Sequence, residues 1–285
     1  MDVMEKICWA NTDNFEQSKF VIIGIPDESQ SHALRKGTEE APFKIRQISN
    51  LRDTYERDGK IFLGRPFQGS EKKVYDFGNI SLSQIENTYD KISASSKIPI
   101  SIGGDHSITR QIINTLAKRH GKISLVYFDA HPDFVSSTTN YYGSVVNDVL
   151  SNIEIDSSVE IGIRTPEQEE LGNIKKHNLK VITPFDIKEQ GIKQVANSII
   201  DRLGDKVYVS FDMDCVDPAH APGVSVPVPM GLDSTDAVYL LKEIAKKGII
   251  GMDVMEVCPI FDIKDRTSHL ASRIISEVLY SSGEI

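Results

Sequence analysis

Short runs of hydrophobic residues recur along the chain, and most of them are continuous rather than alternating with polar residues. Continuous apolar runs are typical of strands that are covered on both faces. The runs lie at residues 20–25, 74–77, 98–102, 123–128, 159–163, 179–182, 207–211 and 249–254. We therefore expect about eight buried strands.

Segments with the spacing of amphipathic helices separate these runs. They lie at residues 41–51, 81–95, 108–119, 167–177, 195–203 and 234–247. Regular alternation of strand and helix predicts a three-layer α/β/α fold with a mostly parallel sheet. Residues 52–73 and 133–144 are expected to be rich in loops, but no linker divides the chain, so we expect one domain over residues 1–285.

The composition adds limits on function. The chain has 285 residues, 40% of them hydrophobic and 26% charged, as in an ordinary globular protein. Its net charge of -9 argues against a general binder of nucleic acids or anionic membranes, because these partners need a basic face. No run reaches the roughly 18 apolar residues of a membrane-spanning helix, and no signal peptide is evident.

The cysteines indicate a reducing environment. Cys8, Cys215 and Cys258 share no C-x-x-C spacing, so neither a disulfide framework nor a cysteine zinc site is suggested. A cytoplasmic location is the expectation that follows. Cys215 comes directly after Asp214, and strand alternation predicts that it packs on the opposite side.

Ligands of open parallel sheets bind outside the carboxyl ends of the strands, so polar residues there are the first candidates for chemistry. The first such segment is GGDHS at residues 103–107, which contains His106. Glycine pairs allow close approach of the backbone to a ligand. A tight turn in which Asp105 or Ser107 caps the next helix explains this segment equally well.

The second segment places three possible ligands at alternate positions. Asp129, His131 and Asp133 follow an apolar strand, and an extended backbone would point all three to one side. Burying unpaired carboxylates together is costly, and a metal ion removes that cost.

The third segment repeats the arrangement with Asp212 and Asp214. Two carboxylates this close cannot both stay ionised in a sheltered crevice without a cation between them. Asp217 precedes a proline and is interpreted as a turn residue.

Together these segments supply a candidate set of carboxylate and imidazole ligands. Such a set suits two divalent cations about 3.5 to 4 Å apart, and a water molecule bound to both cations can lose a proton near neutral pH. Oxygen-rich ligation with some imidazole and no thiolate favours Mn²⁺, with Fe, Co and Zn left open. The six residues are His106, Asp129, His131, Asp133, Asp212 and Asp214.

The three segments together resemble the metal signatures of the ureohydrolase family, which contains arginase, agmatinase and formimidoylglutamase. The likeness covers nearly the whole chain, and residues 24–46 are similar to the agmatinase branch in particular. The resemblance implies an arginase-like fold with two manganese ions bridged by Asp129 and Asp212. It implies further that His106 and Asp133 complete one ion's ligands and that His131 and Asp214 complete the other's.

The resemblance also implies roles in catalysis. Glu256 matches the glutamate that holds the substrate guanidinium, and a carboxylate suits a planar cation because it accepts two parallel hydrogen bonds. Asp133 would help to manage the proton. Tyr142 stands where the family has a proton-relaying histidine, and a phenol with a pKa near 10 is a poor base at neutral pH.

A second departure lies in the loop APGVSVP at residues 221–227, where Val224 and Val226 replace hydroxyl residues of the family pattern. Either the substrate is less polar than agmatine or turnover is weak. His220 precedes this loop and offers a substitute relay, although an exposed loop histidine is the favoured interpretation.

The leading hypothesis is a dinuclear manganese amidinohydrolase that converts agmatine to putrescine and urea, a step of polyamine biosynthesis. One alternative is a metallohydrolase acting on another guanidino acid, a formimino compound or an amide. Another is a metal-binding protein with weak or lost activity. The expected partners are a small cationic substrate and further copies of the chain, as a trimer or hexamer, but no nucleic acid or membrane.

Overall fold

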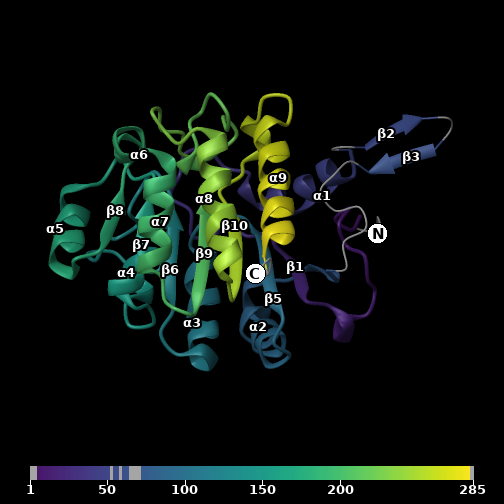
Figure 1. The fold of residues 1–285 in the computed structure, drawn as a ribbon, viewed down its shortest axis with the longest axis horizontal. Coiled ribbons are helices and arrows are strands. Elements are labelled where there is room, and N and C mark those ends of the chain that lie inside the picture. The colour runs from purple at the N-terminus through teal and green to yellow at the C-terminus, as the bar shows by residue number, and fades with distance from the viewer. Residues whose placement is uncertain (1–4, 52–53, 58–59, 64–71, 283–285) are drawn as a thin grey trace.

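A single parallel sheet forms the centre of the protein. The structure, a computed structural model, describes residues 5–51, 54–57, 60–63 and 72–282. Eight strands lie in the order β4-β1-β5-β10-β9-β6-β7-β8, and every neighbouring pair is parallel. Helices cover both faces of this sheet (Figure 1). The expected α/β/α fold is confirmed.

The strands of this sheet are β1 (Phe20–Ile25), β4 (Val74–Asn79), β5 (Ile98–Gly103), β6 (Ser124–Phe128), β7 (Val159–Ile161), β8 (Lys180–Ile182), β9 (Val207–Asp212) and β10 (Gly251–Met255). The α-helices of the described residues are α1 (Ala41–Leu51), α2 (Ile85–Ala94), α3 (Ile108–His120), α4 (Val145–Val149), α5 (Gln168–His177), α6 (Pro184–Gln190), α7 (Ile192–Arg202), α8 (Ser234–Lys247) and α9 (Arg266–Ser281).

Two apolar clusters, one on each face of the sheet, explain the continuous hydrophobic runs. Leu240 of α8 and Ile274 of α9 belong to one cluster, whereas Ile112 of α3 and Val146 of α4 belong to the other. Every residue of β1 is buried. A strand covered on both sides has no face in contact with water, so apolar residues dominate the runs, and most of the candidate ligands appear where the strands end.

Some predicted elements differ from the observed ones. Helix α9 was missed, although its apolar residues recur at helical spacing and it packs against α1 and α8. The run at 159–163 ends as a strand at Ile161, because Gly162 has a φ of 101°. A Cβ there would lie 2.8 Å from the carbonyl oxygen of Asp129, so only glycine fits this close approach.

The expected loop at 52–73 is described only in part. Strands β2 (Thr54–Arg57) and β3 (Lys60–Leu63) form an antiparallel hairpin that was not predicted. It extends away from the main sheet (Figure 1). Residues 52–53, 58–59 and 64–71 of the expected loop lie outside the described residues, as do residues 1–4 and 283–285 of the expected domain. The single domain over residues 1–285 stays a prediction.

The strand order determines where the polar segments meet. Strands β5, β10, β9 and β6 are consecutive neighbours in the middle of the sheet. Because all four are parallel, their carboxyl ends lie along one edge, and each is followed by one of the candidate segments. None of the described helices is both long and apolar enough to span a membrane.

Candidate metal centre and active site

His106 reaches the carboxyl edge through a tight turn after β5. A Cβ on Gly104 would lie 1.8 Å from the carbonyl oxygen of Asp27, so this close passage requires glycine. Asp105 Oδ1 accepts a hydrogen bond from the Ser107 backbone N–H at 2.9 Å. The turn is therefore stabilised by Asp105, as one interpretation expected, and the same turn carries the His106 imidazole into the buried centre.

The segment after β6 is bent rather than extended. Asp129 Oδ1 accepts the backbone N–H of His131 at 2.7 Å, and Asp133 has a left-handed backbone with a φ of 48°. The extended geometry expected from the alternate spacing was therefore wrong. The bend still directs the three side chains to one place, since Asp129 and Asp133 both approach His106.

The segment after β9 turns as a short 3₁₀ helix, Met213–Cys215. Asp212 Oδ1 accepts the N–H of Asp214 at 2.7 Å, and Asp214 Oδ1 accepts the N–H of Ala130 at 3.0 Å. One oxygen of each carboxylate is thus used to hold the turns together, and the other is directed to the histidines. Cys215 is buried in the apolar cluster under α8, as predicted for a packing residue.

The two histidines form two groups of ligand atoms that share Asp129. His106 Nδ1 lies 3.0 Å from Asp129 Oδ2, 3.0 Å from Asp212 Oδ2 and 3.5 Å from Asp133 Oδ2. His131 Nδ1 lies 3.3 Å from Asp129 Oδ1 and 3.1 Å from Asp214 Oδ2. Asp129 therefore directs one oxygen to each histidine, which is the geometry of a bridging carboxylate.

Hydrogen bonds behind His106 determine which of its nitrogens carries the proton. Ser210 Oγ donates to Asp253 Oδ1 at 2.7 Å and lies 2.8 Å from His106 Nε2. Because the serine proton is used on Asp253, the oxygen accepts from Nε2–H. In a neutral imidazole Nδ1 then has no proton, and its lone pair faces carboxylate oxygens. Metal-ligating histidines are oriented in the same way.

The carboxylates around the histidines repel one another. Burial and the charges of Asp214 and Asp129 raise the pKa of Asp212 well above its usual value. Burial lowers the tendency of His106 to take a proton, but the adjacent Asp129 and Asp212 carboxylates hold its pKa well above the ordinary range. A positive charge is therefore required at this place, and either a proton or a metal ion can provide it.

One oxygen in the centre has no hydrogen-bond donor. Asp129 Oδ2 is buried without such a partner among the described residues, and leaving a buried carboxylate oxygen unsatisfied is costly. A divalent cation between this oxygen and His106 Nδ1 would satisfy both. The residues present thus fit a metal ion on donor chemistry and on this unpartnered atom.

Tyr127, a residue of the buried strand β6, supports the same centre. Its hydroxyl donates to Asp133 Oδ2 at 2.5 Å, and its ring stacks on the His106 imidazole with centroids 4.6 Å apart. Burial and the charge of Asp133 raise the pKa of Tyr127 well above 10, so the phenol stays protonated and donates. In the sequence, the only indication of this role is that the Tyr127 hydroxyl lies two residues before Asp129 and so on the same side of an extended strand.

Glu256 lies directly after β10 and beside the His106 group. Its Oε1 accepts the His106 backbone N–H at 2.8 Å, and its Oε2 accepts the hydroxyl of Ser225. Its backbone is left-handed, with a φ of 63°. Burial raises the pKa of Glu256 to about 7. The sequence did not indicate this role of Ser225, because the loop at residues 221–227 was interpreted only from the hydroxyl groups that Val224 and Val226 lack.

Tyr142 lies on the same side of the molecule as these groups. It begins the 3₁₀ helix Tyr142–Ser144, and its ring contacts His32 and Tyr141 with centroid distances of 6.0 and 5.7 Å. Burial raises the pKa of its phenol, and the charges of Glu256 and Asp133 raise it further. The charges of these two carboxylates therefore affect the Tyr142 phenol. Its role as a replacement for the proton-relaying histidine stays a prediction.

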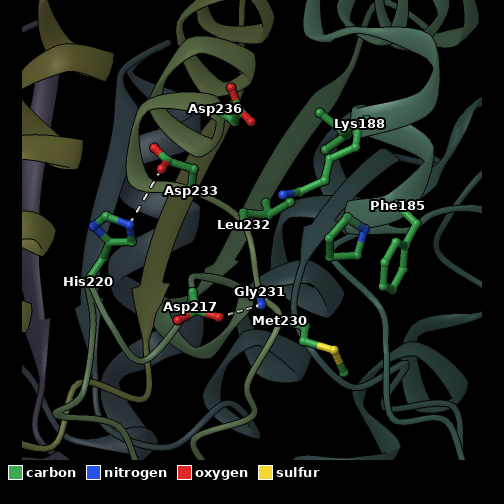
Figure 2. A pocket seen from close by; sticks show the side chains of 11 residues that line it. Phe185, Lys188, Asp217, His220, Met230, Gly231, Leu232, Asp233 and Asp236 are labelled. Atoms are coloured by element: carbon green, nitrogen blue, oxygen red, sulfur yellow. Dashed lines mark hydrogen bonds and ion pairs between the residues drawn. The ribbon is translucent and has the colours of Figure 1, made fainter.

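His220 does not join the metal centre. It lines a separate pocket of about 640 Å³ between α6 and the start of α8, and Figure 2 shows it opposite Asp233, with its Nε2 3.5 Å from Asp233 Oδ2. Lys188 and Asp236 line the same pocket. Its side chain is 41% exposed, which favours the interpretation of an exposed loop histidine.

Comparison with known proteins gives consistent matches over most of the chain. The sequence model of the Arginase family matches residues 18–280. An agmatinase of Neisseria meningitidis is 35% identical in an alignment 278 residues long that covers 93% of this chain and 87% of that agmatinase. The matched region includes the whole carboxyl edge with its carboxylates and histidines.

Solved structures of similar fold lead to the same family. Agmatine ureohydrolase of Thermoplasma volcanium has a TM-score of 0.84 at 30% identity and covers 98% of this chain and 94% of its own. Proclavaminate amidino hydrolase from Streptomyces clavuligerus has a TM-score of 0.83 at 30% identity, with 93% of this chain and 91% of its own covered. The similarity therefore includes the order of the strands that brings the candidate ligands together.

Proposed function

Since this chain belongs to the arginase family, we propose that it is a dinuclear metal hydrolase that releases urea from a guanidino compound. The observation that carries the proposal is the pair of imidazole–carboxylate groups that share Asp129 beside the buried carboxylate of Glu256. Agmatine, with putrescine as the second product, is the first candidate substrate, because agmatinases are among the similar proteins.

We propose two Mn²⁺ ions at this centre, with Asp129 and Asp212 as bridging ligands. Bound together, two such ions lower the pKa of water toward neutrality and so supply the nucleophile for hydrolysis. One ion would be held in addition by His106 and Asp133, and the other by His131 and Asp214. The shared position of Asp129 between the histidines supports this division.

Glu256 is proposed to bind and orient the guanidinium. Its carboxylate is buried next to the His106 group, so a cation that reaches it lies beside the metal centre. Two parallel N–H bonds to a carboxylate define the plane of the cation as well as its position. Placing the guanidinium carbon in a defined orientation is the main contribution that this side chain makes to catalysis.

Asp133 and Tyr142 are proposed to handle protons. Asp133 Oδ2 accepts from the Tyr127 hydroxyl and lies 3.5 Å from His106 Nδ1, so a proton received there stays within a hydrogen-bonded group. Tyr142 is a weak substitute for an imidazole relay, since its pKa is raised rather than lowered. Slow protonation of the leaving amine at neutral pH follows.

A second candidate keeps the metal centre and changes the substrate. Val224 and Val226 stand where the family pattern has hydroxyl residues, and an amidino hydrolase is among the similar structures, so another guanidino acid is the second candidate substrate. A formimino compound or an amide is a further possibility within this class. A metal-binding protein without activity is disfavoured, because Glu256 is buried at the centre where a substrate cation would need it.

The test is urea release from agmatine, arginine and 4-guanidinobutanoate by protein loaded with Mn²⁺, with chelator-treated protein as control. Release from agmatine fastest of the three supports the first candidate, and release from the acid substrate fastest supports the second. If the protein binds two ions per chain but releases no urea from any guanidino compound, the hypothesis of a metal-binding protein without activity is supported instead. Homo-oligomerisation and a cytoplasmic location stay predictions, to be checked by light scattering and by fractionation.

A further inference from the structure

Ser225 makes a contact that the pattern of its loop did not indicate. Its side chain is buried, and its Oγ donates to Oε2 of Glu256. The other oxygen, Oε1, accepts the backbone N–H of His106 at 2.8 Å. Each oxygen of the Glu256 carboxylate therefore has one donor from the chain itself, and its direction is determined before any substrate binds.

The loop that carries Ser225 is held by contacts of the two residues before it. Val224 forms an isolated antiparallel bridge with Val257. The backbone N–H of Cys258 donates to the carbonyl of Gly223 at 2.7 Å, and the N–H of Gly223 donates to Thr267 Oγ1 at 2.8 Å. Because these contacts hold the backbone directly before Ser225, its hydroxyl has a defined position beside the carboxylate.

The backbone of Glu256 is equally well defined. Its φ of 63° is a conformation that a non-glycine residue adopts only where its surroundings impose it. Its N–H donates to the carbonyl of Gly104 at 3.0 Å. The side chain still has three rotatable bonds, and the last of them has a broad energy profile. The His106 N–H holds one oxygen of the carboxylate and the Ser225 hydroxyl holds the other, so together they restrict rotation of the carboxylate plane.

A carboxylate offers about four acceptor positions, two on each oxygen. The described residues use one position on each oxygen, which leaves one on each for a ligand. A planar cation with two parallel N–H groups needs this pair of positions in one plane, whereas an ammonium acts as a point charge and needs only one.

We propose that Ser225 is a positioning residue that fixes the plane of the Glu256 carboxylate and so selects a guanidinium or amidinium cation over a primary ammonium. This inference rests on the proposed function. It also explains how the loop serves a guanidino substrate although Val224 and Val226 carry no hydroxyl: Ser225 acts through Glu256 and not on the substrate.

The test compares wild type with Ser225→Ala in the Mn²⁺-loaded protein, using agmatine as substrate and pentane-1,5-diamine, which has an ammonium in place of the guanidinium, as inhibitor. Loss of a hydrogen bond to a charged group is expected to lower kcat/KM for agmatine about tenfold. The inhibition constant of the diamine is expected to change less than about twofold, because a point charge does not depend on the carboxylate plane.

The matched control is Ser272→Ala, which removes an equally buried hydroxyl of α9 that has no hydrogen-bond partner among the described residues. It is expected to leave both constants unchanged. Equal weakening of agmatine and diamine in Ser225→Ala, or unchanged selectivity in an active protein, overturns the inference and leaves the proposed function standing. Absence of urea from every guanidino compound in wild type overturns the proposed function, and the inference with it.

Discussion

Among the described residues, the Arg46–Asp76 pair and the metal centre are both buried and charged, and they differ in whether the chain itself neutralises the charge. In one, Arg46 Nε and Nη2 each lie 2.9 Å from an oxygen of Asp76. The backbone N–H groups of Ile7 and Gly78 also donate to that carboxylate. In the other, at the metal centre, Asp129 Oδ2 has no hydrogen-bond donor among the described residues.

The difference separates a structural cluster from a functional one. Burial raises the pKa of Asp76, but the hydrogen bonds and charge of Arg46, together with the backbone N–H groups of Ile7 and Gly78, outweigh burial, and the net pKa is lowered. At the metal centre, burial and the charge of Asp129 raise the pKa of Asp133 well above its usual value. A completed ion pair holds the fold together, whereas an uncompensated cluster is organised for a cation from outside.

The largest effect is expected for Asp129→Asn. One oxygen of Asp129 faces each histidine, so both ions should be lost and activity with them. Metal analysis after loading with Mn²⁺ measures this directly. Mn²⁺ should also raise the Tm of the wild type and not that of the variant, because only a ligand that binds the folded state stabilises it. A wild type that holds one ion or none would disprove the dinuclear site.

The opposite result is expected for Asp76→Asn in the completed pair. Removing one partner leaves Arg46 buried without its counter-charge, which costs about 3–5 kcal/mol of unfolding free energy, while the metal content should stay at two ions per chain. Urea unfolding and metal analysis measure the two quantities. Loss of the ions from the folded variant would show that the clusters are not independent.

The same pair predicts an acid dependence. Since the pKa of Asp76 is lower in the folded protein than in the unfolded chain, its stabilisation is complete above about pH 4 and is lost as the pH falls through the folded value. The difference in stability between wild type and Asp76→Asn should therefore shrink on acidification.

A third change leaves the Arg46–Asp76 pair and the metal ligands intact and removes the charge of Glu256 beside the metal centre. Glu256→Gln should keep both ions and lower kcat/KM about 10²–10³-fold, because the substrate cation loses a buried counter-charge. A neutral amide also offers only one acceptor oxygen. Steady-state kinetics with metal analysis on the same sample checks both statements. Retention of wild-type kcat/KM would disprove the guanidinium-binding role.

A smaller effect is expected behind the centre, at Ser210→Ala. The His106 imidazole would lose the acceptor that keeps the proton on Nε2, and loss of such outer contacts typically weakens metal binding about 10–100-fold. Titration with Mn²⁺ measures the affinity. The control is Ser93→Ala, which removes a buried hydroxyl of α2 with no hydrogen-bond partner among the described residues. Equal affinity in Ser210→Ala and wild type would contradict the orienting role.

The smallest effect is expected for Tyr142→His. An imidazole relays protons better at neutral pH than a phenol whose pKa is raised, and general acid–base help contributes up to about 10²–10⁴-fold. We expect a gain of about tenfold in kcat near pH 7 with a smaller change in KM, because a relay acts mainly in the transition state. An unchanged or lower kcat would show that Tyr142 does not stand in for the relay.

Much of the fold could be predicted because its signals are local. Continuous apolar runs identified the strands of the main sheet, and the ligands that follow them are close in sequence. Helix α9 carried a local signal that was overlooked. The hairpin of β2 and β3 and the bend at Asp133 were not predicted, since loops lack a regular apolar pattern and the left-handed backbone of Asp133 depends on its neighbours.

The sequence by itself determined the chemistry of the site: which carboxylates and histidines follow the buried strands, and that they need a cation. Only the tertiary structure decided what surrounds them. Ser225 and Glu256 are 31 residues apart, and His106 and Glu256 are 150 apart. Such pairs meet because β5, β10 and β9 are neighbours in the sheet, and strand order is a property of long-range packing that no local pattern of residues contains.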